Sequence, residues 1–464
     1  MNDWERQQQR LFSLTEGEAV VHRDKSGKVS PNWLRACKDA RHSTVGLMDK
    51  VADPSNLQKA FKRVRANDGA AGVDDMSTHE LGVWLIEHLS ELSIELQTDV
   101  YHPSPVRGVE IRKPQGGYRQ LGIPTAKDRL VQQALLQVLT PLYERIFSPH
   151  SHGFRPGRGC HGALRESVGY VKDGHPVVVD LDLAKFFDEV NHHRLMWTLS
   201  RRIGDERILR LIHRFIKAGL FMGGLMTQRL KGTPQGGPLS PLLSNIVLDE
   251  LDKELERRGH HYVRYADDVK IFVKSEAAGN RVLQRITGFI ESTLKLKVNQ
   301  LKSRVCTCNE LNFLGHRITW HGHLALSAMS LARVKAKIRE LTKRNQGISL
   351  HALLRKLRQT LHGWLLYFRY ASMTRVVTKL DSWIRRKLRC FRLKQCKRVI
   401  GIVRWLRRLS VGRELCWKTA LSGKGWWRLS NSPGSDIGMS NAWFSAQGYY
   451  SLLDNYKTLF RTLG

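Results

Sequence analysis

The sequence predicts an α+β fold in which a small antiparallel sheet carries a group of carboxylates and a basic helical region follows. Residues 262–273 alternate apolar and polar side chains around an acidic pair, a pattern typical of a β-hairpin with that pair at its tip. Residues 176–183 form an apolar strand that is interrupted by two acids. Residues 331–408 repeat apolar side chains at helical spacing among many Lys and Arg. Strands that carry the acids and helices that carry the bases together give the predicted α+β class.

The acids of these two strand segments point to a cation site. Period-two geometry places Asp180 and Asp182 on one face of their strand, and Asp267 and Asp268 form the hairpin tip. Carboxylates on a buried strand are costly unless a cation lies against them, and that cation is either a metal or a Lys or Arg side chain. Mg²⁺ prefers carboxylate oxygens and keeps waters that a phosphate can replace. Two metals about 4 Å apart can activate a 3′-oxygen and stabilise leaving pyrophosphate. The competing interpretation of the hairpin tip is a solvated turn.

The charge of the chain favours a polyanionic partner. The 464 residues are enough for two or three domains, and 76 Lys and Arg against 42 Asp and Glu give a net charge of +34. Residues 333–413 contain 24 Lys and Arg and 2 acids, so this segment alone carries +22. An excess of this size indicates RNA or DNA, through phosphate contacts and counterion release. A solvated helix face and a membrane-surface helix are the lesser alternatives.

Nothing in the sequence suggests export. The polar start of the chain lacks the apolar core of a signal peptide, and no apolar run is long enough to span a bilayer. The seven cysteines are odd in number and scattered, which suits structural thiols in a reducing compartment. We therefore expect a protein of the bacterial cytoplasm or nucleoid that does not bind a membrane.

Five sequence blocks, in order, resemble the motifs of a reverse transcriptase. Among the reverse transcriptases, the blocks resemble those of the bacterial group II intron enzymes, which are also called maturases. Each block alone is a weak signal, but five in this order are hard to obtain by chance. The resemblance runs from about residue 67 to the C-terminus and is to the endonuclease-lacking type, because we find no paired Cys and no His-Asn-His cluster. The blocks are Lys113–Thr125, Gly153–Gly159, Val179–Asp188, Pro234–Pro241 and Tyr265–Asp268.

The resemblance implies a right-hand polymerase. Fingers and a palm with an antiparallel sheet would be followed by an α-helical thumb, or X domain, and a small basic C-terminal tail. The expected domains are an N-terminal extension at 1–66, the reverse transcriptase fingers and palm at 67–325, the thumb at 326–410 and a DNA-binding region at 411–464.

The resemblance also implies a catalytic centre. Asp182, Asp267 and Asp268 match the positions that hold two Mg²⁺ ions, for which Mn²⁺ is a substitute. Asp180 is not required by the family and is left out of the metal set. Lys302 lies where the family places a lysine, which could protonate the leaving pyrophosphate.

A second group of residues is implied to bind the nucleotide. The hairpin through residues 108–121 carries two cations that would hold the incoming triphosphate, although without the resemblance they would be ordinary surface cations. Phe187 would lie beneath the incoming sugar and exclude a 2′-hydroxyl; the alternative is that Phe186 and Phe187 both pack in the core. The implied nucleotide-binding residues are Lys113, Arg119, Phe187, Gln235 and Tyr265.

A third group is implied to contact RNA or DNA. The loop at 153–159 would contact template phosphates, and the turn at 313–316 looks like the primer-contacting turn that closes the palm. Aromatics interleaved with cations in the C-terminal region can stack on bases and bind phosphates. The residues in this group are Arg155, Arg158, Gly315, Arg355, Arg385, Arg386, Lys387, Trp427 and Arg428.

The predicted function is that of an RNA-directed DNA polymerase that also binds a group II intron RNA and assists its splicing and mobility. Its partners would be intron RNA or another RNA template, a DNA primer or target, and dNTPs, and a dimer is left open. Two alternatives stand beside this one. The chain could be an RNA-binding splicing cofactor without significant polymerase activity, or a domesticated reverse transcriptase in defence or repair. Phe187 and the Tyr265–Asp268 sequence speak against an RNA-templated RNA polymerase.

Overall fold

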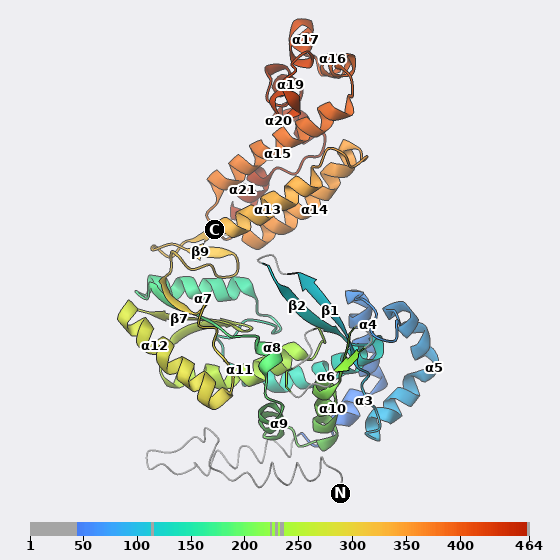
Figure 1. Cartoon of the computed structure of the whole chain (residues 1–464), viewed down its shortest axis with the longest axis vertical. Helices are drawn as coiled ribbons and strands as arrows, with labels where there is room; N and C mark the ends of the chain where they lie inside the picture. The colour runs from blue at the N-terminus through green and yellow to red at the C-terminus, as the bar shows by residue number, and fades with distance from the viewer. Residues whose placement is uncertain (1–43, 113–115, 223–224, 228–230, 233–235, 462–464) are drawn as a thin grey trace. The chain divides into compact units, whose positions relative to one another are not determined.

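The computed structural model describes residues 44–112, 116–222, 225–227, 231–232 and 236–461 (Figure 1). The chain forms two compact units. Unit 1 contains the chain through Tyr170 together with His175–Cys306, and unit 2 contains Val171–Gly174 and the chain from Thr307. The boundaries between the four predicted domains stay predictions.

Two four-stranded sheets lie in unit 1. The first has the order β2-β1-β4-β5 and consists of β1 (Val106–Arg112), β2 (Tyr118–Ile123), β4 (Leu220–Met222) and β5 (Leu225–Thr227). The antiparallel pair β1–β2 is the predicted basic hairpin, and β1 also pairs in parallel with β4. The second sheet has the order β6-β7-β3-β8 and consists of β3 (Val177–Asp182), β6 (His261–Tyr265), β7 (Asp268–Val273) and β8 (Arg304–Thr307). Because β7 is antiparallel to both β6 and β3, the tip of the predicted acidic hairpin lies beside the end of β3.

Helices surround these sheets and share one hydrophobic core with the second sheet. Thr125 caps α6 by accepting a hydrogen bond from the Asp128 amide at 3.1 Å, at the predicted helix start. Helix α12 packs on β3 and β7, and α11 packs on β6 and α6. Leu130 of α6, Leu181 of β3 and Leu251 of α11 are fully buried in this common core. The helices of unit 1 and its boundary are α3 (Leu47–Ala52), α4 (Pro54–Asn67), α5 (Thr78–Gln97), α6 (Ala126–Glu144), α7 (Cys160–Lys172), α8 (Phe186–Glu189), α9 (His192–Ser200), α10 (Glu206–Lys217), α11 (Ser240–Arg257), α12 (Glu276–Phe289) and the π-helix η1 (Ile290–Leu294).

Unit 2 is almost entirely helical and has its own core. It starts with the antiparallel hairpin of β9 (His316–Ile318) and β10 (Leu324–Leu326). The predicted apolar stripe of α14 is buried in the core, whereas basic residues of the same helix, such as Arg355, are exposed. The helices are α13 (Ala328–Leu341), α14 (Leu350–Phe368), α15 (Thr374–Gln395), α16 (Val399–Arg408), α17 (Arg413–Ala420), α18 (Gly425–Leu429), α19 (Pro433–Gly438), α20 (Asn441–Ala446) and α21 (Leu452–Arg461).

The predicted α+β fold, with an antiparallel sheet followed by a helical C-terminal region, is confirmed. Among the described residues, no helix combines the length and the apolar character that crossing a bilayer requires. The six cysteines in this part of the chain are free thiols, and Cys306 and Cys308 are buried.

Candidate active site

The β6–β7 hairpin and the end of β3 bring the predicted metal-binding residues to one end of the sheet. The strand register places Asp182 directly opposite Asp268, and Asp267 lies in the turn that joins β6 to β7. Opposed residues of an antiparallel pair have side chains on one face, with Cβ atoms about 4.5–5.5 Å apart. Asp182 and Asp268 are therefore neighbours, and Asp267 is adjacent to them in the chain.

The turn itself has an unusual backbone. Ala266 has a φ of 59°, in the left-handed region. This conformation costs a residue with a side chain about 1–2 kcal/mol, so the surroundings must hold it in place. Tyr265, which precedes it, is half-buried, and burial raises the pKa of its hydroxyl.

Lys270 is the residue of this site that the sequence analysis missed. Its buried ammonium forms ion pairs with both Asp180 and Asp268. The sequence analysis left open whether the acids of β3 face a metal or a protein cation, and Asp180, which is opposite Lys270 in the register, faces a protein cation. Burial raises the pKa of Asp268, and Lys270 acts in the opposite direction. The available signal was the i, i+2 spacing of Asp268 and Lys270 on one strand, which places them on one face.

Asp182 is held by the segment that follows η1. The Asn299 side-chain amide donates to Asp182 Oδ2 at 3.1 Å, and the backbone amide of Asn299 donates to the Asp182 carbonyl at 2.9 Å. Lys302 Nζ lies 3.6 Å from Asp182 Oδ2, and its side chain is 63% exposed. The structure thus brings together two residues that the sequence analysis assigned to catalysis, Asp182 and Lys302.

The donor set has the right chemistry for divalent cations, because carboxylate oxygens are the ligands that Mg²⁺ prefers. Within the described ranges, however, no three His, Cys, Asp or Glu side chains are grouped so that they could hold a metal ion. Asp268 faces Lys270, and Asp182 accepts a hydrogen bond from Asn299. The strand register places Asp182 and Asp268 together, and their binding of a metal stays a prediction.

Phe187 lies on α8, directly after β3. It is half-buried against the core, whereas Phe186 is buried within it. The two rings meet edge to face, with centroids 5.3 Å apart and planes at 70°. Phe186 therefore packs in the core, and Phe187 packs against the core while it stays partly exposed. Its contact with the incoming sugar stays a prediction.

The other predicted nucleotide-binding residues are Lys113, Gln235 and Arg119. Lys113 and Gln235 lie outside the described residues. Arg119 is on β2, opposite Ile111 of β1. Its predicted contact with a triphosphate stays a prediction.

Arg155 requires a correction. Its side chain is only 2% exposed and pairs with Glu144, with Nη2–Oε2 at 3.0 Å. Its guanidinium also donates to the backbone carbonyls of Ser148 and Ser151. These contacts turn it inward, so we no longer assign Arg155 to nucleic-acid contact. Arg158 of the same loop is exposed, and its contact with template phosphates stays a prediction.

The turn that contains Gly315 is fixed within unit 2. Leu314 and Gly315 have φ values of 49° and 77°, and the carbonyl of each accepts a hydrogen bond, from the Tyr367 hydroxyl at 3.0 Å and the Ser330 hydroxyl at 2.9 Å. A Cβ on Gly315 would lie 2.7 Å from Ser330 Oγ, so glycine is required here. A contact of this turn with a primer stays a prediction.

Three of the predicted nucleic-acid residues form one cluster in unit 2. The Arg386 guanidinium stacks over the Trp427 ring at 4.0 Å and donates to the Trp427 carbonyl at 3.0 Å. Lys387 Nζ lies 5.9 Å from the same ring and 5.2 Å from that of Trp383. Arg385 on α15 is half-exposed, and Arg355 and Arg428 are exposed. A second cation–ring pair, in which Arg392 lies 3.8 Å from the Trp405 ring centroid, was not predicted from the sequence.

Two families match the chain. The family described as "Reverse transcriptase (RNA-dependent DNA polymerase)" matches residues 111–318. The family described as "Group II intron, maturase-specific domain" matches residues 331–409. The first match contains the β3, β6 and β7 residues of the candidate site, and the second covers α13 to α16.

Several known proteins are similar to the chain. Protein YkfC of Escherichia coli (strain K12) is 34% identical over 353 residues, which cover 67% of this chain and 92% of YkfC. The group II intron-encoded protein LtrA of Lactococcus lactis subsp. cremoris is 37% identical over 203 residues, which cover 43% of this chain and 33% of LtrA. The chain thus spans most of one relative and a third of the other. A solved partial Cas6-RT-Cas1–Cas2 complex is 25% identical, with a TM-score of 0.35 and coverage of 53% of this chain and 42% of that one.

Proposed function

The chain belongs to the group II intron-encoded reverse transcriptases and maturases, and from this membership we propose that it copies RNA into DNA. One observation carries the proposal: Asp182 lies opposite Asp268, with Asp267 beside it, inside the segment that matches the reverse transcriptase family. Reverse transcriptases generally depend on divalent metals. We assign Asp182, Asp267 and Asp268 to two Mg²⁺ ions, for which Mn²⁺ is a substitute.

Each residue of the site has a role in this proposal. Bound metals would supply activation of the primer 3′-hydroxyl and stabilisation of charge on the leaving pyrophosphate. Asp182, Asp267 and Asp268 provide the oxygen ligands. Lys302, an exposed ammonium beside Asp182, is positioned to donate a proton toward the pyrophosphate, and Arg119 neutralises the triphosphate.

The test of this function is primer extension on an RNA template with Mg²⁺ and dNTPs, comparing the wild type with Asp267→Ala. We expect the wild type to extend the primer and the variant to lose about 10³-fold or more in rate, because an alanine removes a charged ligand. RNA binding, measured in parallel by fluorescence anisotropy, should be unchanged. A wild type that binds structured RNA tightly but does not extend the primer would contradict the polymerase and favour the splicing-cofactor alternative.

Phe187 selects deoxynucleotides in this proposal, and Phe187→Ala tests that role. Removing the ring opens space for a 2′-hydroxyl, so incorporation of rNTPs relative to dNTPs should rise at least about tenfold. Phe187→Tyr is the matched control, because it keeps the bulk of the ring and should keep the discrimination. Single-nucleotide incorporation kinetics measure both. An unchanged ratio in Phe187→Ala would mean that another residue excludes the ribose.

The match to the maturase-specific domain favours a second function, which is binding of a group II intron RNA to assist its splicing and mobility. The cations of unit 2, including the Arg386–Trp427 cluster, supply the charge and the stacking surface for this RNA. RNA and other nucleic acids are the supported partners. We also propose dNTPs and a DNA primer as ligands and the bacterial cytoplasm as the location.

A further inference from the structure

A buried arginine lies directly behind the turn that carries Asp267 and Asp268. Arg264, on β6, is fully buried, and its guanidinium forms an ion pair with the equally buried Asp252 of α11. Its Nε donates to Asp252 Oδ1 at 2.8 Å, and its Nη1 donates to Asn245 Oδ1 at 2.8 Å and to the Ala266 carbonyl at 3.0 Å. One side chain therefore connects α11 to the backbone of the turn.

The choice of arginine follows from this geometry. A buried cation needs a carboxylate, and Asp252 supplies it. The planar guanidinium has enough donors to satisfy Asp252, Asn245 and the Ala266 carbonyl at once, whereas a lysine has a single ammonium.

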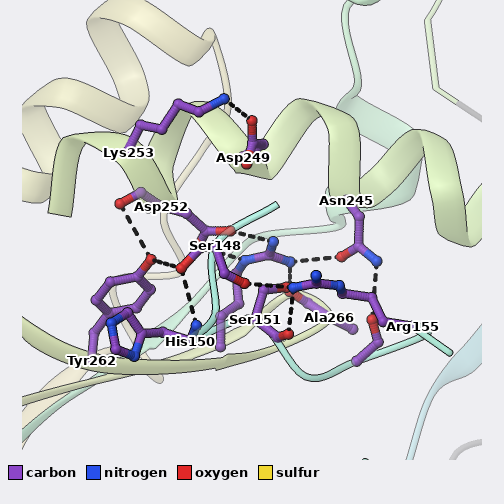
Figure 2. A network of polar contacts seen from close by, with 12 residues as sticks. Ser148, His150, Ser151, Arg155, Asn245, Asp249, Asp252, Lys253, Tyr262 and Ala266 are labelled. Carbon is purple, nitrogen blue, oxygen red and sulfur yellow. Dashed lines mark hydrogen bonds and ion pairs between the residues drawn. The ribbon is translucent and has the colours of Figure 1, made fainter. Parts of the chain in front are cut away.

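Asn245, on the same helix as Asp252, links Arg264 to the loop that contains Gly153. Its side-chain oxygen accepts from Arg264, and its side-chain amide donates to the carbonyl of Gly153 at 3.0 Å. A Cβ on Gly153 would lie 2.3 Å from the Ala266 nitrogen, so the backbones of Gly153 and Ala266 are in direct contact. Figure 2 shows Asn245 and Ala266 in this network.

Backbone hydrogen bonds fasten the same loop to β6. The His152 amide donates to the Arg264 carbonyl at 2.8 Å, and the Arg264 amide donates to the His150 carbonyl at 2.9 Å. The loop is thereby aligned beside the last residues of β6. Ala266, whose left-handed backbone needs support, is contacted by both the Arg264 guanidinium, through its carbonyl, and the backbone of Gly153, through its nitrogen.

We propose that Arg264 and Asn245 are positioning residues that fix the turn at 265–268 and so set the placement of Asp267 and Asp268. The inference rests on the proposed function, because it concerns the same carboxylates. Displacement of a reacting group by about 1 Å can cost about 10²-fold in rate, so the contacts that hold this turn have a direct effect on catalysis. Neither residue touches the nucleotide or the template in this proposal.

The test compares Asn245→Ala with Tyr262→Phe. Asn245→Ala removes the link between Arg264 and Gly153, whereas Tyr262→Phe removes bonds of the same buried network to Ser148 and the Asp252 carbonyl that do not involve the turn. For Asn245→Ala we expect kcat to fall about 10- to 100-fold and the half-saturating Mg²⁺ concentration to rise at least about threefold. The KM for dNTP and the Kd for RNA should stay within about twofold of wild type. Tyr262→Phe should keep the wild-type kcat per folded molecule.

A second variant and a direct metal measurement keep the test independent of folding and of activity. Arg264→Lys keeps a charge for Asp252 but cannot also reach Ala266, so it should show the same rise in Mg²⁺ requirement. Mn²⁺ binding, followed by the electron paramagnetic resonance signal of the free ion, should weaken at least about threefold in both variants, in step with the Mg²⁺ requirement.

The outcomes separate the two proposals. If Asn245→Ala and Arg264→Lys lose thermal stability but keep the wild-type kcat and metal dependence per folded molecule, the residues are structural and the positioning role is overturned. If the wild type neither extends a primer nor binds Mn²⁺, the proposed function fails, and the positioning role fails with it.

Discussion

Asp182→Asn should reduce primer extension by about 10³-fold or more, whereas Asp180→Asn should cost less than about tenfold, although both acids lie on the same strand. The structure gives them different partners. Asp180 forms an ion pair with buried Lys270, whereas Asp182 lies opposite Asp268 and beside Lys302. An asparagine at 182 removes a charged ligand from the proposed metal site, and one at 180 removes one of the two carboxylates that neutralise Lys270.

The loss of stability should follow the opposite order, with Asp180→Asn more destabilised than Asp182→Asn. The Asp182 side chain is partly exposed and accepts a hydrogen bond from Asn299. The free energy of unfolding of Asp182→Asn should therefore lie within about 1 kcal/mol of the wild-type value. Asp180→Asn weakens a buried ion pair and should lower the free energy of unfolding by about 1–3 kcal/mol. Extension rates at saturating dNTP and Mg²⁺, together with thermal unfolding of each variant, give both quantities. Equal loss of activity in the two variants would mean that Asp180 also belongs to the metal set.

The parts of this site that were predictable from sequence are those that depend on local pattern. Alternation around Asp267 and Asp268 predicted the hairpin, and the period of two predicted that Asp180 and Asp182 share a face. The resemblance to reverse transcriptases then separated Asp182 from Asp180. These inferences need only neighbouring residues, and the observed strands confirm the hairpin and the strand.

The parts that were not predictable depend on how distant segments pack. The pairing of Lys270 with Asp180 follows from the register between β3 and β7, and that of Arg264 with Asp252 follows from the packing of α11 on β6. The sequence contains 76 Lys and Arg, and no local pattern selects the two that face these distant acids. Arg155 was assigned to nucleic acid because the family resemblance implies that its loop contacts template phosphates. The loop instead folds around the guanidinium and supplies carbonyls to it, a contact that no pattern in the loop indicates.

In unit 2, the structural role of one acid was likewise not predictable from the sequence. The segment 333–413 was recognised as basic, and its two acids were counted only as a small offset to the charge. One of them, Asp381 of α15, is buried and accepts hydrogen bonds from the Tyr449 hydroxyl at 2.7 Å, the Leu452 amide at 3.0 Å and the Leu453 amide at 2.8 Å. It therefore satisfies the first free amides of α21 from a different helix, as an N-cap residue would.

Asp381→Ala should strongly destabilise unit 2. It leaves the Tyr449 hydroxyl and two amides of α21 without their acceptor, and it also removes a bond from Ser451 at 3.2 Å. Each unsatisfied buried group costs about 1–3 kcal/mol, and because such losses are not fully additive we expect a total of about 3–5 kcal/mol. Differential scanning calorimetry should show the transition of unit 2 shifted down by roughly 10 °C.

Glu340→Ala is the matched control for this loss, because Glu340 is an exposed acid of the same unit that pairs with Lys337 at 3.1 Å. An exposed pair of this kind is worth well under about 1 kcal/mol, so its transition should stay within about 2 °C of the wild type. RNA binding should follow the same order, because α15 carries Arg385, Arg386 and Lys387 and its packing against α21 depends on Asp381. If unit 2 unfolded at the same temperature in Asp381→Ala as in Glu340→Ala, the amides of α21 would have found water or another acceptor. Asp381 would then not be the residue that joins α15 to α21.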